Sequence, residues 1–176
     1  MAEDLVAVFT GKNLKNGMTA EGGSGHWIAR ENRVRQAQYL LCIRNRRETW
    51  AETDFEHGTA FLVARISGTS NSPHDNRIVI NFNEYAEIEV ANAWHICTKG
   101  QRYPVAYLNA DKVQKDLGLD FTSLIWKPFN PNAQPSTQAP QKSPMDIQKT
   151  VMQEAKAMLS DALGVSEENI EITVRY

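Results

Sequence analysis

Aromatic, basic and amide side chains gather in one stretch of the sequence, and together they suit the binding of a flat, charged ligand. Trp27 and Trp50 bracket an arginine-rich segment that contains Asn45. A tryptophan ring can stack on a nucleobase, and an amide can hydrogen-bond to the edge of that base. The candidate ligand-binding residues are Trp27, Asn45, Arg46, Arg47, Trp50 and Trp94. Tryptophan is more often a core residue, so the exposure of these rings decides between the two interpretations.

The charge of the chain is unevenly distributed. Between His26 and Trp50 there are six arginines and two glutamates, a local balance of +4, whereas the whole chain has a formal net charge of -2. Affinity for a nucleic-acid backbone comes from many Lys and Arg contacts, so the net charge argues against a uniformly basic binding surface. A focused basic patch and a solvated surface of mixed charge remain the two interpretations of the segment.

No recognisable catalytic motif is present. The histidines form no i, i+4 pair that would hold a metal on one helix face, so neither a metal nor a cofactor is predicted. No serine stands in a Gly-x-Ser-x-Gly motif. Cys42 and Cys97 are expected to be small hydrophobic residues in a reducing compartment, most simply the cytoplasm. An enzyme is therefore less favoured than a binding protein.

The elements that must position these residues follow from the pattern of apolar residues. Short apolar or alternating runs predict strands over Leu5–Phe9, Gln38–Ile43, Thr59–Ile66, Arg77–Phe82, Ala86–Val90 and Thr122–Phe129. Gln38–Ile43 is the candidate central strand, and Asn83-Glu84 is expected to join two of the others as a hairpin. A helix is predicted over Ala110–Leu117, ended by Gly118. The predicted fold class is α+β.

The composition of the chain changes after residue 129. Residues 1–129 are expected to form the globular domain, and residues 130–144, with four prolines, a flexible linker. Residues 145–176 show helical and then alternating apolar spacing, which predicts a helix-strand tail. The apolar face of this tail needs a cover, and we expect the tail of a second copy to supply it in a homodimer. No apolar run is long enough to cross a membrane.

Two of the predicted strands resemble those of the PUA-like superfamily. The runs are Tyr39-Leu-Leu-Cys-Ile-Arg-Asn45 and Gly58-Thr-Ala-Phe-Leu-Val-Ala-Arg-Ile66, which are similar to strands of its EVE and ASCH branches. The resemblance covers residues 1 to about 129. It implies a small, mixed, partly closed β-barrel with a pocket that holds a nucleobase or modified base through aromatic and amide side chains.

The resulting hypothesis is a non-catalytic binding module that recognises a nucleobase or modified nucleotide in DNA or RNA. Its pocket is expected near Trp27, Asn45 and Trp50. One alternative is an assembly protein that works through residues 145–176, and the other is a nuclease-type hydrolase whose site has no sequence motif. A pocket that exposes Trp27 and Trp50 would favour binding, and burial of both rings in the core would favour the alternatives.

Overall fold

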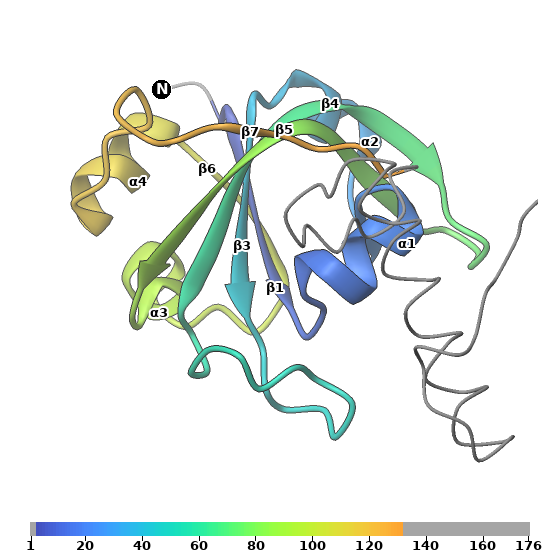
Figure 1. Cartoon of the computed structure of the whole chain (residues 1–176), viewed down its shortest axis with the longest axis horizontal. Helices are drawn as coiled ribbons and strands as arrows, with labels where there is room; N and C mark the ends of the chain where they lie inside the picture. Colours follow the sequence, from blue (N-terminus) through green and yellow to red (C-terminus); the bar gives the residue numbers. More distant parts are fainter. Residues whose placement is uncertain (1–2, 132–176) are drawn as a thin grey trace, which may run out of the picture. The chain divides into compact units, whose positions relative to one another are not determined.

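The computed structural model describes residues 3–131, which form one mixed β-sheet with short helices on both of its faces (Figure 1). The predicted tail over residues 145–176, and the predicted linker beyond residue 131, lie outside the described residues. The sheet curls strongly into a half-barrel. The predicted α+β class and the mixed sheet are therefore confirmed.

The sheet has the strand order β2-β5-β4-β3-β1-β6, with β7 paired to β5. Its strands are β1 (Leu5–Thr10), β2 (Ser24–Trp27), β3 (Tyr39–Arg44), β4 (Ala60–Asn71), β5 (Ile78–Val90), β6 (Val105–Leu108) and β7 (Lys127–Pro128). The β1/β3 pair is parallel and the other pairs are antiparallel. The strand predicted to be central, now β3, lies between β1 and β4 inside the sheet.

Helices cover both faces of the sheet, which explains the unbroken apolar sequence of β1. The helices are η1 (Leu14–Met18), α1 (Thr19–Glu21), α2 (Glu31–Gln36), α3 (Ala93–Thr98) and α4 (Ala110–Leu117). Leu5 and Ala7 pack into the hydrophobic cluster that includes residues of α3 and α4. Val6 and Val8 point the other way and pack into the cluster that includes Met18 of η1 and a residue of α2. Because a hydrophobic core covers each face of the sheet, the side chains on both faces of β1 are apolar and its sequence does not alternate.

The hairpin predicted at Asn83-Glu84 is wrong, because β5 continues through this point. Opposite Ile66 and Arg65 of β4, the partners on β5 are Phe82 and Glu84, so Asn83 is the extra residue of a β-bulge. The bulge changes which residues face each core: Phe82 and Tyr85 contact one cluster, whereas Ile88 contacts the other. A bulge also bends its strand, and the further register shifts between β4 and β5 add to the curl of the sheet.

The helix predicted over Ala110–Leu117 is confirmed as α4, and it ends at Gly118 in the left-handed conformation with φ 66°. The strand predicted over Thr122–Phe129 is wrong, apart from the two-residue β7. The Asp120 carboxylate accepts the Thr122 N–H at 2.9 Å, and this local bond favours a turn where the apolar residues had indicated a strand.

Candidate functional site

Several segments of the chain line a cavity of about 560 Å³. The end of β1 and the turn after it supply Thr10, Gly11 and Lys12. The loop after β3 supplies Asn45, Glu48 and Trp50, which we call the loop side. The strand β2 and the β4–β5 connection supply His26, Trp27, His74 and Arg77, which we call the hairpin side. Phe9, Gly25 and Pro104 complete the lining.

The loop side is held against the turn after β1. The Asn45 N–H donates to the Thr10 carbonyl at 2.8 Å, and the Glu52 N–H donates to the Gly11 carbonyl at 2.9 Å. Between these two bonds the indole of Trp50 lies on Gly11, where an added Cβ would be 2.8 Å from the ring. Trp50 nevertheless remains 61% exposed, so its ring is available to a ligand.

The buried side chain of Arg44 fixes the position of the turn after β1. Its side chain is fully buried, and its Nη1 donates to the carbonyls of Thr10 at 3.2 Å and Lys12 at 3.0 Å. Its Nη2 pairs with the Asp54 carboxylate at 2.8 Å, which ties the loop after β3 to the same guanidinium. Burial lowers the pKa of Arg44, and the nearby Asp54 carboxylate opposes this shift. One buried arginine therefore links both the turn and the loop that line the cavity.

Hydrogen bonds hold the side chains of Trp27 and Asn45 at the cavity. The Trp27 Nε1–H donates to the Ser24 Oγ at 3.1 Å, which fixes the ring at 9% exposure. The Asn45 Oδ1 accepts the Arg47 N–H at 3.0 Å, and this holds the side-chain amide. The Asn45 NH2 group has no hydrogen-bond partner among residues 3–131, so it remains available as a donor to a ligand.

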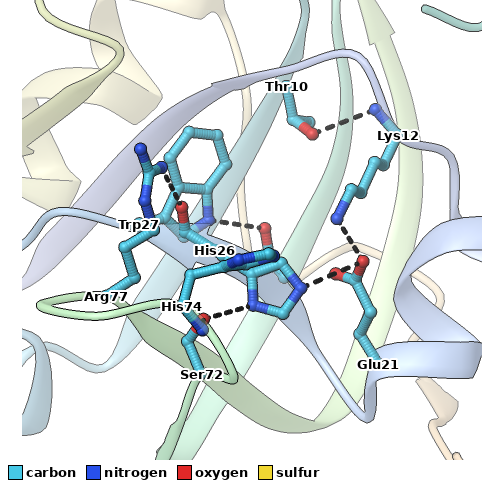
Figure 2. Close-up of polar contacts among 9 residues, drawn as sticks. Thr10, Lys12, Glu21, His26, Trp27, Ser72, His74 and Arg77 are labelled. Carbon is cyan, nitrogen blue, oxygen red and sulfur yellow. Dashed lines mark hydrogen bonds and ion pairs between the residues drawn. The ribbon is translucent and has the colours of Figure 1, made fainter. Parts of the chain in front are cut away.

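The hairpin side contains a connected set of polar side chains (Figure 2). His26 lies between Ser72, whose Oγ is 2.7 Å from Nδ1, and Glu21, whose Oε1 is 3.4 Å from Nε2. Glu21 also forms an ion pair with Lys12. The ring of His74 meets that of His26 edge to face, with centroids 4.9 Å apart. Side chains from α1, β2 and the β4–β5 connection thus meet Lys12 at one end of the cavity.

The structure brings together three of the six residues singled out from the sequence. Trp27, Asn45 and Trp50 line the cavity. Arg46 and Arg47 are exposed on the loop after β3 but outside the lining, and Arg46 pairs with Glu56 at 3.2 Å. Trp94 lies in the core at 6% exposure, stacked on Phe9 with ring centroids 4.6 Å apart.

Lys12, His26, His74 and Arg77 also line the cavity, although no sequence pattern had indicated them. They are scattered in the sequence. The pairing of β2 with the start of β5 brings His26 close to Arg77, and Arg44 holds the backbone of Lys12 beside them. The one available signal was the long polar stretch between Ile66 and Arg77, since loops of that kind often carry binding residues. The β4–β5 connection does contain His74 and Arg77.

A histidine outside the cavity supports its apolar wall. The ring of His57 packs against Phe9 at a centroid distance of 4.9 Å, and its Nδ1 accepts the Arg46 N–H at 3.1 Å. Burial lowers the pKa of His57, and the positive charges of Arg47 and Arg46 lower it further. His57 is therefore held in its neutral form, which suits its role as a hydrogen-bond acceptor.

A second cavity, of about 670 Å³, lies beside η1 and the end of β5. Phe55 and Phe61 line it with stacked rings 5.6 Å apart, and Asp54, Glu87 and Glu89 also line it. Lys15 is the basic residue of this lining. The two cavities therefore differ in chemistry, since the first has basic groups and the second mainly acidic ones.

Neither metal ligands nor a bilayer-spanning helix are found within residues 3–131. No group of three or more His, Cys, Asp or Glu residues in this part of the chain is arranged to hold a metal ion. None of its helices is both long and apolar enough to cross a bilayer. Comparison of the chain with family models, with curated proteins and with solved structures finds no match. The function must therefore be inferred from the chemistry of the site.

Proposed function

We propose that the cavity between the loop side and the hairpin side binds a nucleobase or modified base of a nucleic acid, without catalysis. The observation that carries this proposal is the convergence of Trp27, Asn45 and Trp50 on one cavity. The two aromatic residues come from different elements, β2 and the loop after β3. A base is flat, has a π face for stacking and has a polar edge for an amide, so these side chains match its chemistry.

The exposure of Trp50 supports binding more than a core role. A large aromatic ring that is 61% exposed loses a favourable burial free energy that an ordinary core tryptophan gains. Its position on Gly11 holds one face of the ring against the protein. A base stacked on the other face would recover that burial. Trp27 is mostly buried, so it would contribute a fixed wall and Trp50 the main stacking surface.

The curled sheet is compatible with a PUA-like fold, and we propose this membership as an extension of the site argument. Its support is the half-barrel shape together with the resemblance of β3 and the first part of β4 to strands of that superfamily. A base-binding pocket would be in keeping with such a fold. The proposal about the ligand rests on the cavity and does not depend on the fold assignment.

The test is a titration with short, dye-labelled single-stranded DNA and RNA oligonucleotides, in which binding is measured by the fluorescence anisotropy of the dye. Removing a stacking platform costs about 1 to 3 kcal/mol per base, so Trp50→Ala should weaken binding by about 5-fold or more. Ile125→Ala is the matched control, because Ile125 is 81% exposed and lies outside the cavity. Equal losses in the two variants, or the absence of binding by the parent protein, would contradict the proposal.

One observation favours a second candidate, a hydrolase. A chain of contacts runs from the Ser72 hydroxyl through His26 to Glu21, with spacings of 2.7 Å and 3.4 Å. This is the order of nucleophile, base and carboxylate in serine hydrolases. However, Ser72 is not part of the cavity lining, and its Oγ already accepts the His74 N–H at 3.0 Å. Covalent labelling of Ser72 by a fluorophosphonate, lost in Ser72→Ala, would favour the hydrolase, and no labelling would leave binding as the preferred function.

A further inference from the structure

Lys12 and the hairpin side of the first cavity supply basic groups that stacking and edge recognition of a base do not use. Lys12, His74 and Arg77 all belong to the lining, and Figure 2 shows them around His26. Glu48 is the acidic residue of the lining, and it belongs to the loop side. Within the lining, the basic groups therefore lie at Lys12 and on the hairpin side, and an anionic group would be attracted there.

One hydrogen bond to the backbone orients the Arg77 side chain and leaves most of the N–H donors of its guanidinium available. Its Nη1 donates to the His26 carbonyl at 2.9 Å, which anchors an exposed side chain at the cavity. No other partner of the Arg77 guanidinium is found among residues 3–131. A guanidinium has several N–H donors in one plane, and they match pairs of phosphate oxygens. The carbonyl bond restricts the side chain before a ligand arrives and so reduces the entropy lost on binding.

Lys12 supplies a second positive charge in a fixed place. It follows Gly11, on which Trp50 lies, and its ammonium group pairs with Glu21, which also approaches His26. The Lys12 and Glu21 side chains are 25% and 20% exposed, so the pair is only partly screened by water. The backbone of Lys12 is held by Arg44 through its carbonyl. The lysine is thus positioned between the stacking surface and the histidines.

The second cavity provides an internal comparison. Its lining also combines aromatic rings with charged groups, but Asp54, Glu87 and Glu89 outnumber Lys15 there. An aromatic anion would be repelled by that lining. Of the two cavities, the one that contains Asn45 and Trp50 is therefore also the one whose lining is mainly basic.

From this arrangement we infer that the cavity is built for a nucleotide, with the base on the loop side and a phosphate at Lys12, His74 and Arg77. This inference rests on the proposed base-binding function and adds the phosphate to it. Arg77 contributes paired hydrogen bonds, Lys12 contributes charge, and the ring of His74 contributes a further donor. A phosphorylated ligand should then bind more tightly than the same base and sugar without phosphate.

The experiment compares the four ribonucleoside 5′-monophosphates with the matching nucleosides by isothermal titration calorimetry. A charge-assisted hydrogen bond contributes about 1.5 to 3 kcal/mol, so at least one nucleotide should bind about 10-fold or more tightly than its nucleoside. Arg77→Met should reduce this ratio. Arg35→Met is the matched control, because Arg35 lies on α2, pairs with Glu31 and is outside the cavity. Inorganic phosphate is titrated separately to detect anion binding that does not need the base.

Each outcome has a distinct meaning. Equal affinity for nucleoside and nucleotide would overturn the phosphate site while leaving the base site in place. No binding of either compound or of oligonucleotides would overturn the proposed function and the phosphate site together. If Arg77→Met lowers the melting temperature, Arg77→Lys tests the site again, because it keeps the positive charge and removes the paired donors of the guanidinium. An unchanged ratio in a folded variant of either kind would contradict the inference.

Discussion

The indole of Trp50 lies directly on Gly11, so that a Cβ added to the glycine would be 2.8 Å from the ring. A side chain at position 11 must therefore push the ring away from the turn after β1. The ring is 61% exposed, so moving it should cost little stability, and the Ala51 Cβ, 3.0 Å from the added Cβ, requires a further small shift of the loop. The position of the stacking surface, by contrast, should change.

Gly11→Ala is expected to weaken oligonucleotide binding several-fold while the melting temperature stays within a few degrees. The measurement is a titration followed by the fluorescence anisotropy of a labelled oligonucleotide, which works equally in variants that lack Trp50. In a Trp50→Ala background the same glycine substitution should have a much smaller effect on binding, because no ring is left to displace and only the contact with the Ala51 Cβ remains. Additive losses in the double variant would show that Gly11 acts in some other way.

Arg44→Met should strongly destabilise the protein. The substitution leaves the carbonyls of Thr10 and Lys12 without their side-chain donor and Asp54 without its partner. The expected loss is about 3 kcal/mol in the free energy of unfolding, measured by urea denaturation. Arg35→Met, which breaks the exposed pair with Glu31, should cost about 0.5 kcal/mol or less. Similar losses in both variants would refute the anchoring role of Arg44.

Both cysteine thiols should react slowly in the folded protein. Burial raises the pKa of Cys42 from 9.0 to about 12, and burial together with the Asp116 charge raises that of Cys97 to about 11. A rise of three units leaves about 1,000-fold less thiolate at a given pH below both values. Iodoacetamide labelling followed by mass spectrometry should show Cys42 as the slower of the two, because it is fully buried. Rapid native labelling of Cys42 would contradict the structure.

Stability should fall as the solution becomes acidic, in part because of His57. Its pKa in the folded protein is lowered from 6.5, so the unfolded chain binds a proton more readily. The resulting stabilisation is complete above pH 6.5 and is lost as the pH falls through the lower pKa of the folded state. Urea midpoints from about pH 8 to about pH 5 should show a shallower pH dependence in His57→Gln than in the parent. Parallel curves for the two proteins would exclude this contribution.

Salt should weaken oligonucleotide binding, and Arg46 and Arg47 should account for part of the effect. Both residues are exposed beside the cavity but outside its lining, so they are placed to contact a phosphate that neighbours the bound base. Replacing both with alanine should reduce the slope of log affinity against log salt, by about 0.7 for each single-strand phosphate that is no longer neutralised. Arg46 already pairs with Glu56, so Arg47 should contribute more. If the slope of log affinity against log salt does not change, the bound oligonucleotide does not contact Arg46 and Arg47.

The sequence was most informative where burial alone decides the structure. The apolar runs of β1, β3 and β4 and the helix α4 with its glycine end were all predictable. The bulge at Asn83 was not, because the same polar pair is compatible with a turn or with an unpaired residue in a long strand. Short elements such as α2, which buries only Val34 of its six residues, leave too weak an apolar pattern to detect.

The residues of the candidate site also fall into two groups, those that could be predicted from the sequence and those that could not. Trp27, Asn45 and Trp50 were identified because their side-chain types are informative by themselves. Lys12, His74 and Arg77 carry ordinary surface side chains, and only the pairing of β2 with β5 and the bonds of Arg44 bring them to the same place. Trp94 has the same side chain as Trp50 but stacks on Phe9 in the core, a difference that depends on α3.

The pairing of β1 with β6 matters for how the protein is made. Leu5 lies opposite Leu108, so the first strand of the sheet receives its second neighbour only after most of the described chain has been synthesised. At ~5 to 20 residues per second, the apolar residues of β1 wait for roughly 5 to 20 seconds at the ribosome before that edge can close. During this interval the backbone groups along that edge of β1 are unpaired, and an unpaired strand edge is where one chain can pair with another.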